Sequence, residues 1–273
     1  MEIVWHGGRE MSKAILVVSF GTSYHDTREK TIDAIENAIA QAYPEYTVYR
    51  AWTSGVIRAK LLKRDGIRIN NVKEAMERML LDGITDVVVQ PTHVINGIEN
   101  EIMKNDAGEY AQSFNSLSFG APLLTSEDDN EQITRIIADN FSYLNRENEA
   151  LVLMGHGTAH YSNSIYGALN FRFRDIGNPN IFLGTVESYP CVDSLIKAVK
   201  ESRASRVTLA PFMVVAGDHA NNDLAGCSKE SWKSRFKAAG FEVDCVLKGL
   251  GEYPEVQKLF VSHVNDAMES VQQ

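Results

Sequence analysis

Two histidines and a glutamate follow three successive apolar runs in the second half of this 273-residue sequence. His156 stands in GHGT, Glu187 in TVESYP and His219 in GDHA. Two imidazoles and a carboxylate suit borderline divalent ions such as Co²⁺, Fe²⁺, Ni²⁺ or Zn²⁺, and three protein ligands leave coordination positions open for a reaction. We therefore predict a reactive metal site formed by these three side chains.

Each of the three residues alone has an ordinary explanation, because a single loop histidine is more often hydrogen-bonded than metal-bound. The prediction depends on their coincidence at the ends of three successive strands. Gly155 and Gly157 flank His156 and let another molecule approach the backbone closely. Gly217 is expected to give the chain an unusual backbone angle just before His219.

The elements that must position these residues are short apolar runs alternating with amphipathic helical stretches. In the first half, strands are predicted at residues 14–20, 46–52, 86–90 and 116–119. A helix is predicted over residues 26–42, where Ile32, Ile35 and Ile39 recur at helical spacing. Continuous apolar strands separated by helices predict parallel sheets covered on both faces, an α/β fold.

The same order of segments then occurs a second time. Residues 14–23 resemble residues 150–159, residues 47–54 resemble 181–188, and residues 86–99 align without gaps on 206–219. Three matching segments in one order predict two similar Rossmann-like domains, each with a roughly four-stranded parallel sheet flanked by helices. Ligands of such sheets bind beyond the carboxyl ends of the strands, so we expect an active cleft between the two domains.

The repeat predicts how the chain is divided. We expect an N-terminal extension at residues 1–10, an N-terminal α/β domain at 11–135, and a C-terminal α/β domain at 136–273 that carries the metal site. The C-terminal helix is expected to pack back on the first domain. In the first half, Phe20 stands in the place of His156, Thr53 or Ser54 in that of Glu187, and Glu99 in that of His219.

Composition and charge exclude several classes of protein. The net charge of −9 argues against general nucleic-acid binding, which needs a basic face. No apolar run is long enough for a membrane span, and the first residues lack the pattern of a secretory signal. Three cysteines without paired spacing are expected to be reduced and mostly buried, as in a cytoplasmic protein. Among the other histidines, His25 and His93 are expected to be structural, and His6 and His263 solvated.

Four motifs together resemble one known family. SFGTS at residues 19–23, GHGT at 155–158, the glutamate of TVESYP and GDHANND at 217–223 resemble the anaerobic-pathway sirohydrochlorin cobalt chelatases. These belong to the class II chelatases, relatives of the protoporphyrin ferrochelatases. The resemblance covers nearly the whole chain from Met11 onward.

The resemblance implies an activity and the residues that perform it. The family inserts Co²⁺ into sirohydrochlorin, a precorrin-2 type tetrapyrrole, in anaerobic cobalamin biosynthesis, without ATP. It implies no organic cofactor, a divalent metal as substrate, and a small-molecule tetrapyrrole as the partner. His156 corresponds to the histidine that acts in metal binding and proton removal, and Glu187 and His219 correspond to cobalt ligands. We expect His156 and His219 to accept the pyrrole protons, since a histidine titrates near neutral pH.

The carboxylates of sirohydrochlorin call for polar or cationic contacts at the edge of the site. The basic stretch at residues 58–68, together with Arg172 and Arg174, offers cations for this purpose. Our candidates for substrate contacts are Phe20, Gly21, Ser54, Arg58, Glu99 and His160.

Other functions remain open from the sequence alone. The same donors would serve a sirohydrochlorin ferrochelatase or a nickel chelatase, a zinc hydrolase, or a metal or tetrapyrrole carrier that does not catalyse. The oligomeric state is also open, with a homo-oligomer among the options.

Overall fold

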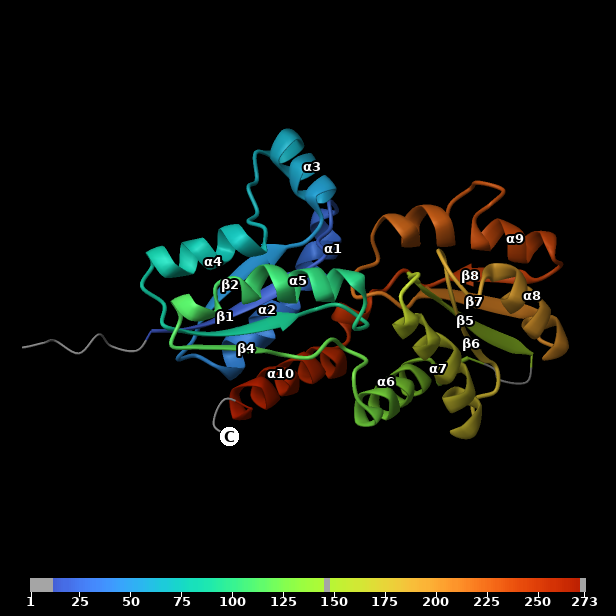
Figure 1. The fold of residues 1–273 in the computed structure, drawn as a ribbon. Coiled ribbons are helices and arrows are strands. Elements are labelled where there is room, and N and C mark those ends of the chain that lie inside the picture. Colours follow the sequence, from blue (N-terminus) through green and yellow to red (C-terminus); the bar gives the residue numbers. More distant parts are fainter. Residues whose placement is uncertain (1–11, 145–147, 271–273) are drawn as a thin grey trace, which may run out of the picture.

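The computed structural model describes residues 12–144 and 148–270, and it contains two four-stranded parallel sheets that lie next to each other (Figure 1). The first has the strand order β2-β1-β3-β4 and the second the order β6-β5-β7-β8. The strands of the first sheet are β1 (Lys13–Ser19), β2 (Thr47–Trp52), β3 (Asp86–Pro91) and β4 (Ser116–Phe119). Those of the second are β5 (Glu149–Gly155), β6 (Ile181–Thr185), β7 (Arg206–Pro211) and β8 (Glu242–Cys245).

Helices connect the parallel strands and cover the sheets. In the first half they are α1 (His25–Lys30), α2 (Ile32–Ala42), α3 (Gly55–Asp65), α4 (Val72–Leu81), α5 (Ile98–Gly108) and the short η1 (Ala111–Ser113). The second half follows α6 (Glu127–Asn140) and has η2 (Tyr161–Asn163), α7 (Ser164–Asp175), α8 (Val192–Glu201), the π-helical turn η3 (Ala220–Leu224), α9 (Trp232–Ala238), η4 (Leu250–Glu252) and α10 (Pro254–Glu269).

The central strands are buried on both faces, as their uninterrupted apolar sequences predict. All residues of β1 after Lys13, and all of β5 after Glu149, are buried. The two halves also share their pairing: β1 pairs with β3 from Lys13 and Asp86, and β5 pairs with β7 from Glu149 and Arg206. The predicted fold class, two similar α/β units with four parallel strands each, is therefore confirmed.

One predicted helix differs from the structure. The expected helix over residues 26–42 is divided into α1 and α2 at Thr31, which has φ −120° and ψ −77°. Thr31 is fully buried, and a Cβ on Gly251 would lie 2.9 Å from the Cβ of Thr31. The backbone at Gly251, in the second half, thus packs closely against Thr31, where the helix is broken. The helical periodicity of residues 26–42 does not reveal this break.

The C-terminal helix α10 returns to the first half and packs against α2, β3 and β4, and it also contacts α6 (Figure 1). The hydroxyl of Tyr43 donates a hydrogen bond of 2.9 Å to the carbonyl of Val261. The expected domain boundary at residue 135 falls inside α6, so the division of the chain remains a prediction. Residues 1–10, the expected extension, lie outside the described residues.

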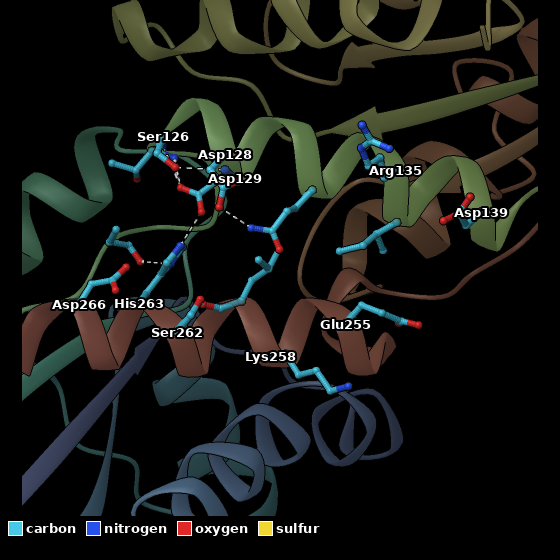
Figure 2. A pocket seen from close by; sticks show the side chains of 15 residues that line it. Ser126, Asp128, Asp129, Arg135, Asp139, Glu255, Lys258, Ser262, His263 and Asp266 are labelled. Atoms are coloured by element: carbon cyan, nitrogen blue, oxygen red, sulfur yellow. Dashed lines mark hydrogen bonds and ion pairs between the residues drawn. The ribbon is translucent and has the colours of Figure 1, made fainter. Parts of the chain in front are cut away.

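The prediction that His263 is solvated is wrong. Its side chain is 4% exposed, and Nε2 lies 2.7 Å from Oδ1 of Asp129 on α6, while Nδ1 lies 3.0 Å from the carbonyl of Ala121. Figure 2 shows this pair in the groove between α6 and α10. His263 belongs to the buried face of α10, at helical spacing from Leu259 and Phe260. The prediction considered only its position near the end of the chain and not this spacing.

Two further sequence expectations can be compared with the structure. No described helix has the length and apolar character that a membrane crossing requires. The three cysteines are free, but the expectation that they are mostly buried is wrong, because Cys227 is exposed and Cys191 and Cys245 are only half-buried.

Candidate metal centre

The three candidate ligands follow the carboxyl ends of three adjacent strands. His156 comes directly after β5, Glu187 lies two residues after β6, and His219 is in the loop after β7. Because β5 is hydrogen-bonded to both β6 and β7, the loops after these strands open at the same edge of the sheet. One ligand atom from each of His156, Glu187 and His219 lies within 4.8 Å of the others. The structure thus brings together all three residues that the sequence singled out.

The backbone fixes His156 and Glu187 relative to each other. The N–H of Glu187 donates a 3.0 Å hydrogen bond to the carbonyl of His156, which continues the pairing of β5 and β6 beyond the strands. Gly157 follows with φ +88°, and a Cβ there would lie 2.8 Å from the Cβ of Thr185 and 3.0 Å from the amide nitrogen of Ser188. Only glycine fits this turn without strain, as Gly21 does at φ +102° in the equivalent turn of the first half.

Both imidazoles have a partner at Nδ1. Nδ1 of His156 lies 2.9 Å from the carbonyl of Gly157, and Nδ1 of His219 lies 2.7 Å from Oδ2 of Asp223. A carbonyl and a carboxylate oxygen accept hydrogen bonds, so in a neutral ring with these contacts Nδ1 is the donor and the lone pair lies on Nε2. The prediction about Gly217 is wrong, because it is not among the glycines with positive φ.

The candidate ligands are accessible to a large molecule. The side chains of His156, Glu187 and His219 are 45%, 55% and 33% exposed. Two imidazoles and a carboxylate form a donor set for a borderline divalent ion, and their exposure leaves room for a second ligand on the ion.

Loops of the first half face these loops of the second half. The hydroxyl of Tyr24 lies 3.4 Å from Oδ1 of Asp218, the residue before His219. A second contact between the halves joins His160 and α5, where Nε2 of His160 lies 3.3 Å from Oε1 of Glu101. Both halves therefore border the candidate metal centre, as the repeated fold predicted.

The predicted substrate contacts have varied surroundings. Phe20 is 46% exposed after β1, next to Gly21, whose backbone lies against the Trp52 ring. The hydroxyl of Ser54 accepts a hydrogen bond from the backbone of Ile57 and caps α3. Glu99 is exposed at the start of α5.

The cationic candidates are largely engaged elsewhere. The guanidinium of Arg58 donates to the carbonyl of Ile69 and to the carboxylate of Glu74, which also pairs with Arg68. Arg172 pairs with Glu127. A substrate carboxylate would have to compete with these partners, and a role for Arg58 in binding remains a prediction.

Comparison with known proteins identifies the family. The model of the cobalt chelatase (CbiK) family matches residues 13–269. The chain belongs to the CbiK cobalt chelatase family. The sirohydrochlorin cobaltochelatase of Salmonella typhimurium is 42% identical over 258 residues, which cover 94% of this chain and 97% of that protein. The sirohydrochlorin cobaltochelatase CbiKC of Nitratidesulfovibrio vulgaris is 30% identical over 266 residues, covering 95% and 92%.

A solved structure shows the same fold. SirB from Bacillus subtilis with Fe³⁺ superposes with a TM-score of 0.66 at 14% identity, covering 96% of this chain and 98% of that one. At this identity the similarity concerns the arrangement of the elements in this CbiK family member and not its individual side chains.

Two contacts of this cobalt chelatase family member were not predicted from its sequence. Asp223 stands four residues after His219, a spacing that places two side chains on one face of a helical turn and could have revealed the contact. Glu101 and His160 are 59 positions apart, and no local pattern links them.

Proposed function

We propose that this chain inserts Co²⁺ into sirohydrochlorin without ATP, as a lyase that forms nitrogen–metal bonds in anaerobic cobalamin biosynthesis. Membership of the CbiK family and the names of two relatives support the reaction. The main support for the proposed metal site is the convergence of His156, Glu187 and His219, whose ligand atoms lie within 4.8 Å of one another. These three side chains hold the incoming ion.

The ion enters the site as a hydrated dication and exchanges part of its water for two imidazole nitrogens and a carboxylate oxygen. Nε2 of His156 and of His219 provide the lone pairs, because Nδ1 of each ring is engaged with Gly157 or Asp223. Three protein ligands leave coordination positions at which pyrrole nitrogens can attack. The substantial exposure of all three side chains lets the flat macrocycle approach.

Insertion replaces two inner N–H protons of the macrocycle by one Co²⁺, so charge balances when two protons leave. As the pyrrole nitrogens take the ion, the imidazole nitrogens release it and regain lone pairs next to the ring. His156 and His219 are then placed to accept the protons, and histidine is suited to this because its ordinary pKa lies near neutrality. Glu187 balances the positive charge of the ion before transfer.

The substrate contacts are proposed at the border between the two halves. The exposed ring of Phe20 offers an apolar surface for the macrocycle, and His160 stands at the contact between η2 and α5. The same ligand set also accommodates Fe²⁺, Ni²⁺ or Zn²⁺, and these ions are expected to compete with Co²⁺ for the site. Family membership favours catalysis over a carrier or a hydrolase.

Absorption spectroscopy of sirohydrochlorin with Co²⁺ and catalytic amounts of protein tests the proposal. We expect many turnovers by the native chain and a loss of about 100-fold or more for His156→Ala, Glu187→Ala and His219→Ala. Near-native turnover in all three variants would exclude the proposed ligands. A spectral change limited to one equivalent of protein would indicate a carrier.

A further inference from the structure

Asp223 contacts one of the proposed cobalt ligands without being a member of the ligand group. Its Oδ2 lies 2.7 Å from Nδ1 of His219, across the turn η3. η3 is a π-helical turn closed by a hydrogen bond from the amide of Ala225 to the carbonyl of Ala220. Such turns are rare and are frequent at functional sites.

Three consecutive side chains of this turn reach back four residues. Asn221 donates 2.7 Å to the carbonyl of Gly217, Asn222 donates 3.0 Å to the carboxylate of Asp218, and Asp223 accepts from His219. The first two contacts hold the loop, whereas only the contact of Asp223 reaches a proposed ligand. Asn221 and Asn222 therefore stabilise the loop, and Asp223 orients the imidazole of His219.

The two imidazoles are held by partners of different kinds. The ring of His156 is fixed by a backbone carbonyl, that of Gly157, which no substitution removes. The ring of His219 is fixed by a side chain that is 45% exposed and can be exchanged with little effect on the core. Metal-binding histidines commonly donate their second N–H to a carboxylate, which sets the tautomer and the direction of the ring.

We infer that Asp223 is a positioning residue for metal insertion, which holds Nδ1–H of His219 so that Nε2 points its lone pair at the incoming ion. This inference rests on the proposed function, in which His219 is a cobalt ligand. Without the carboxylate, the ring rotates about its side-chain bonds and exchanges tautomers. Part of the population then presents an N–H in place of a lone pair to Co²⁺.

The test measures Co²⁺ binding to the intact protein in the absence of any tetrapyrrole. The variants are Asp223→Ala, Asp223→Glu and, as the matched control, Asn222→Ala, which removes a contact of the same turn but not the one to His219. For Asp223→Ala we expect a dissociation constant 10- to 100-fold higher and a changed visible spectrum of the bound ion, since the coordination geometry alters. Asp223→Glu recovers part of the affinity, and Asn222→Ala binds Co²⁺ like the native chain.

Steady-state kinetics add a second measurement. For Asp223→Ala we expect a lower kcat/KM for Co²⁺ with an unchanged KM for sirohydrochlorin. The inference is overturned if Asp223→Ala binds Co²⁺ with native affinity and spectrum, or if Asn222→Ala loses as much affinity, because loop rigidity alone would then explain the effect. The two proposals can fail separately. If the native chain inserts no Co²⁺ but Asp223→Ala still binds Co²⁺ more weakly than the native chain, the positioning role is supported and the proposed function is refuted.

Discussion

The imidazole rings of His156 and His219 stand edge to face, with their centroids 4.8 Å apart and their planes at 85°. They come from loops after β5 and β7, and Glu187 comes from the loop after β6. An ion bound by all three residues would add a further link between the loops after these three neighbouring strands.

Bound Co²⁺ is therefore expected to stabilise the folded chain. A ligand that binds only the folded state at about 100 times its dissociation constant stabilises it by about 2.7 kcal/mol. Thermal unfolding with added Co²⁺ and with a chelator measures this as a rise in Tm. His156→Ala should abolish the rise, and His25→Ala, at an exposed position paired with Asp65, should keep it. An equal rise in both variants would place the bound ion elsewhere.

Gly157 controls the shape of the His156 loop. Gly157→Ala places a side chain at φ +88° and within 3 Å of Thr185 and Ser188, so we expect a loss of about 1–3 kcal/mol of stability and weaker Co²⁺ binding. Gly167→Ala is the control, because a Cβ there meets nothing within 4 Å in the middle of α7. Urea unfolding and Co²⁺ titration compare the two variants, and native Co²⁺ binding by Gly157→Ala would show that the loop tolerates the change.

The Asp129–His263 pair connects α6 to α10. Burial raises the pKa of Asp129, but hydrogen bonds from His263 and Ser126 outweigh it and hold the pKa below its usual value. The pair therefore contributes to the free energy of unfolding at pH values above the ordinary carboxyl pKa. This contribution is lost as the pH falls through the lowered pKa of Asp129 in the folded chain. Asp129→Asn should cost about 3 kcal/mol of unfolding free energy at neutral pH, since it leaves His263 buried beside a neutral partner.

Asp128→Asn is the matched control for this pair. Asp128 lies in the same helical turn, is exposed, and accepts a hydrogen bond from Gln132 instead of His263. Equal losses in the two variants, measured by urea unfolding, would assign the effect to the charge at the start of α6 and not to the buried pair.

His93 gives the stability a pH dependence of its own. Both ring nitrogens are buried and have no hydrogen-bond partner among the residues that the structure describes. Burial lowers the pKa of His93 to about 4. The unfolded chain, with an ordinary histidine pKa near 6.5, binds the proton more readily, so stability is full above that pH and declines as the pH falls towards 4. Between about pH 7.5 and about pH 5, His93 lowers the free energy of unfolding by about 2 kcal/mol.

His93→Leu should remove this part of the pH dependence, because leucine has no proton to bind. Unfolding free energies at the two pH values measure the difference between the native chain and the variant. His25→Leu, at an exposed position, should keep the native slope. An unchanged slope in His93→Leu would show that other groups cause the acid loss.

The sequence by itself determined the fold class and the three residues of the candidate centre. Uninterrupted apolar runs such as β1 and β5 are typical of strands buried on both faces, as in parallel sheets covered by helices. Once the strands are parallel, the residues after neighbouring strands share one edge of the sheet. The positions of His156, Glu187 and His219 therefore followed from the order of the segments.

Only the tertiary structure decided which side chains meet across the chain. Three of these contacts link segments that are distant in sequence. His263 is buried against Asp129, and His160 contacts Glu101. Gly251 packs against Thr31, where the helix is broken. Local patterns report which face of an element is apolar, but not which polar group packing will place opposite another. Such pairs are fixed by the way whole helices and loops pack together, and this packing depends on all of the chain at once.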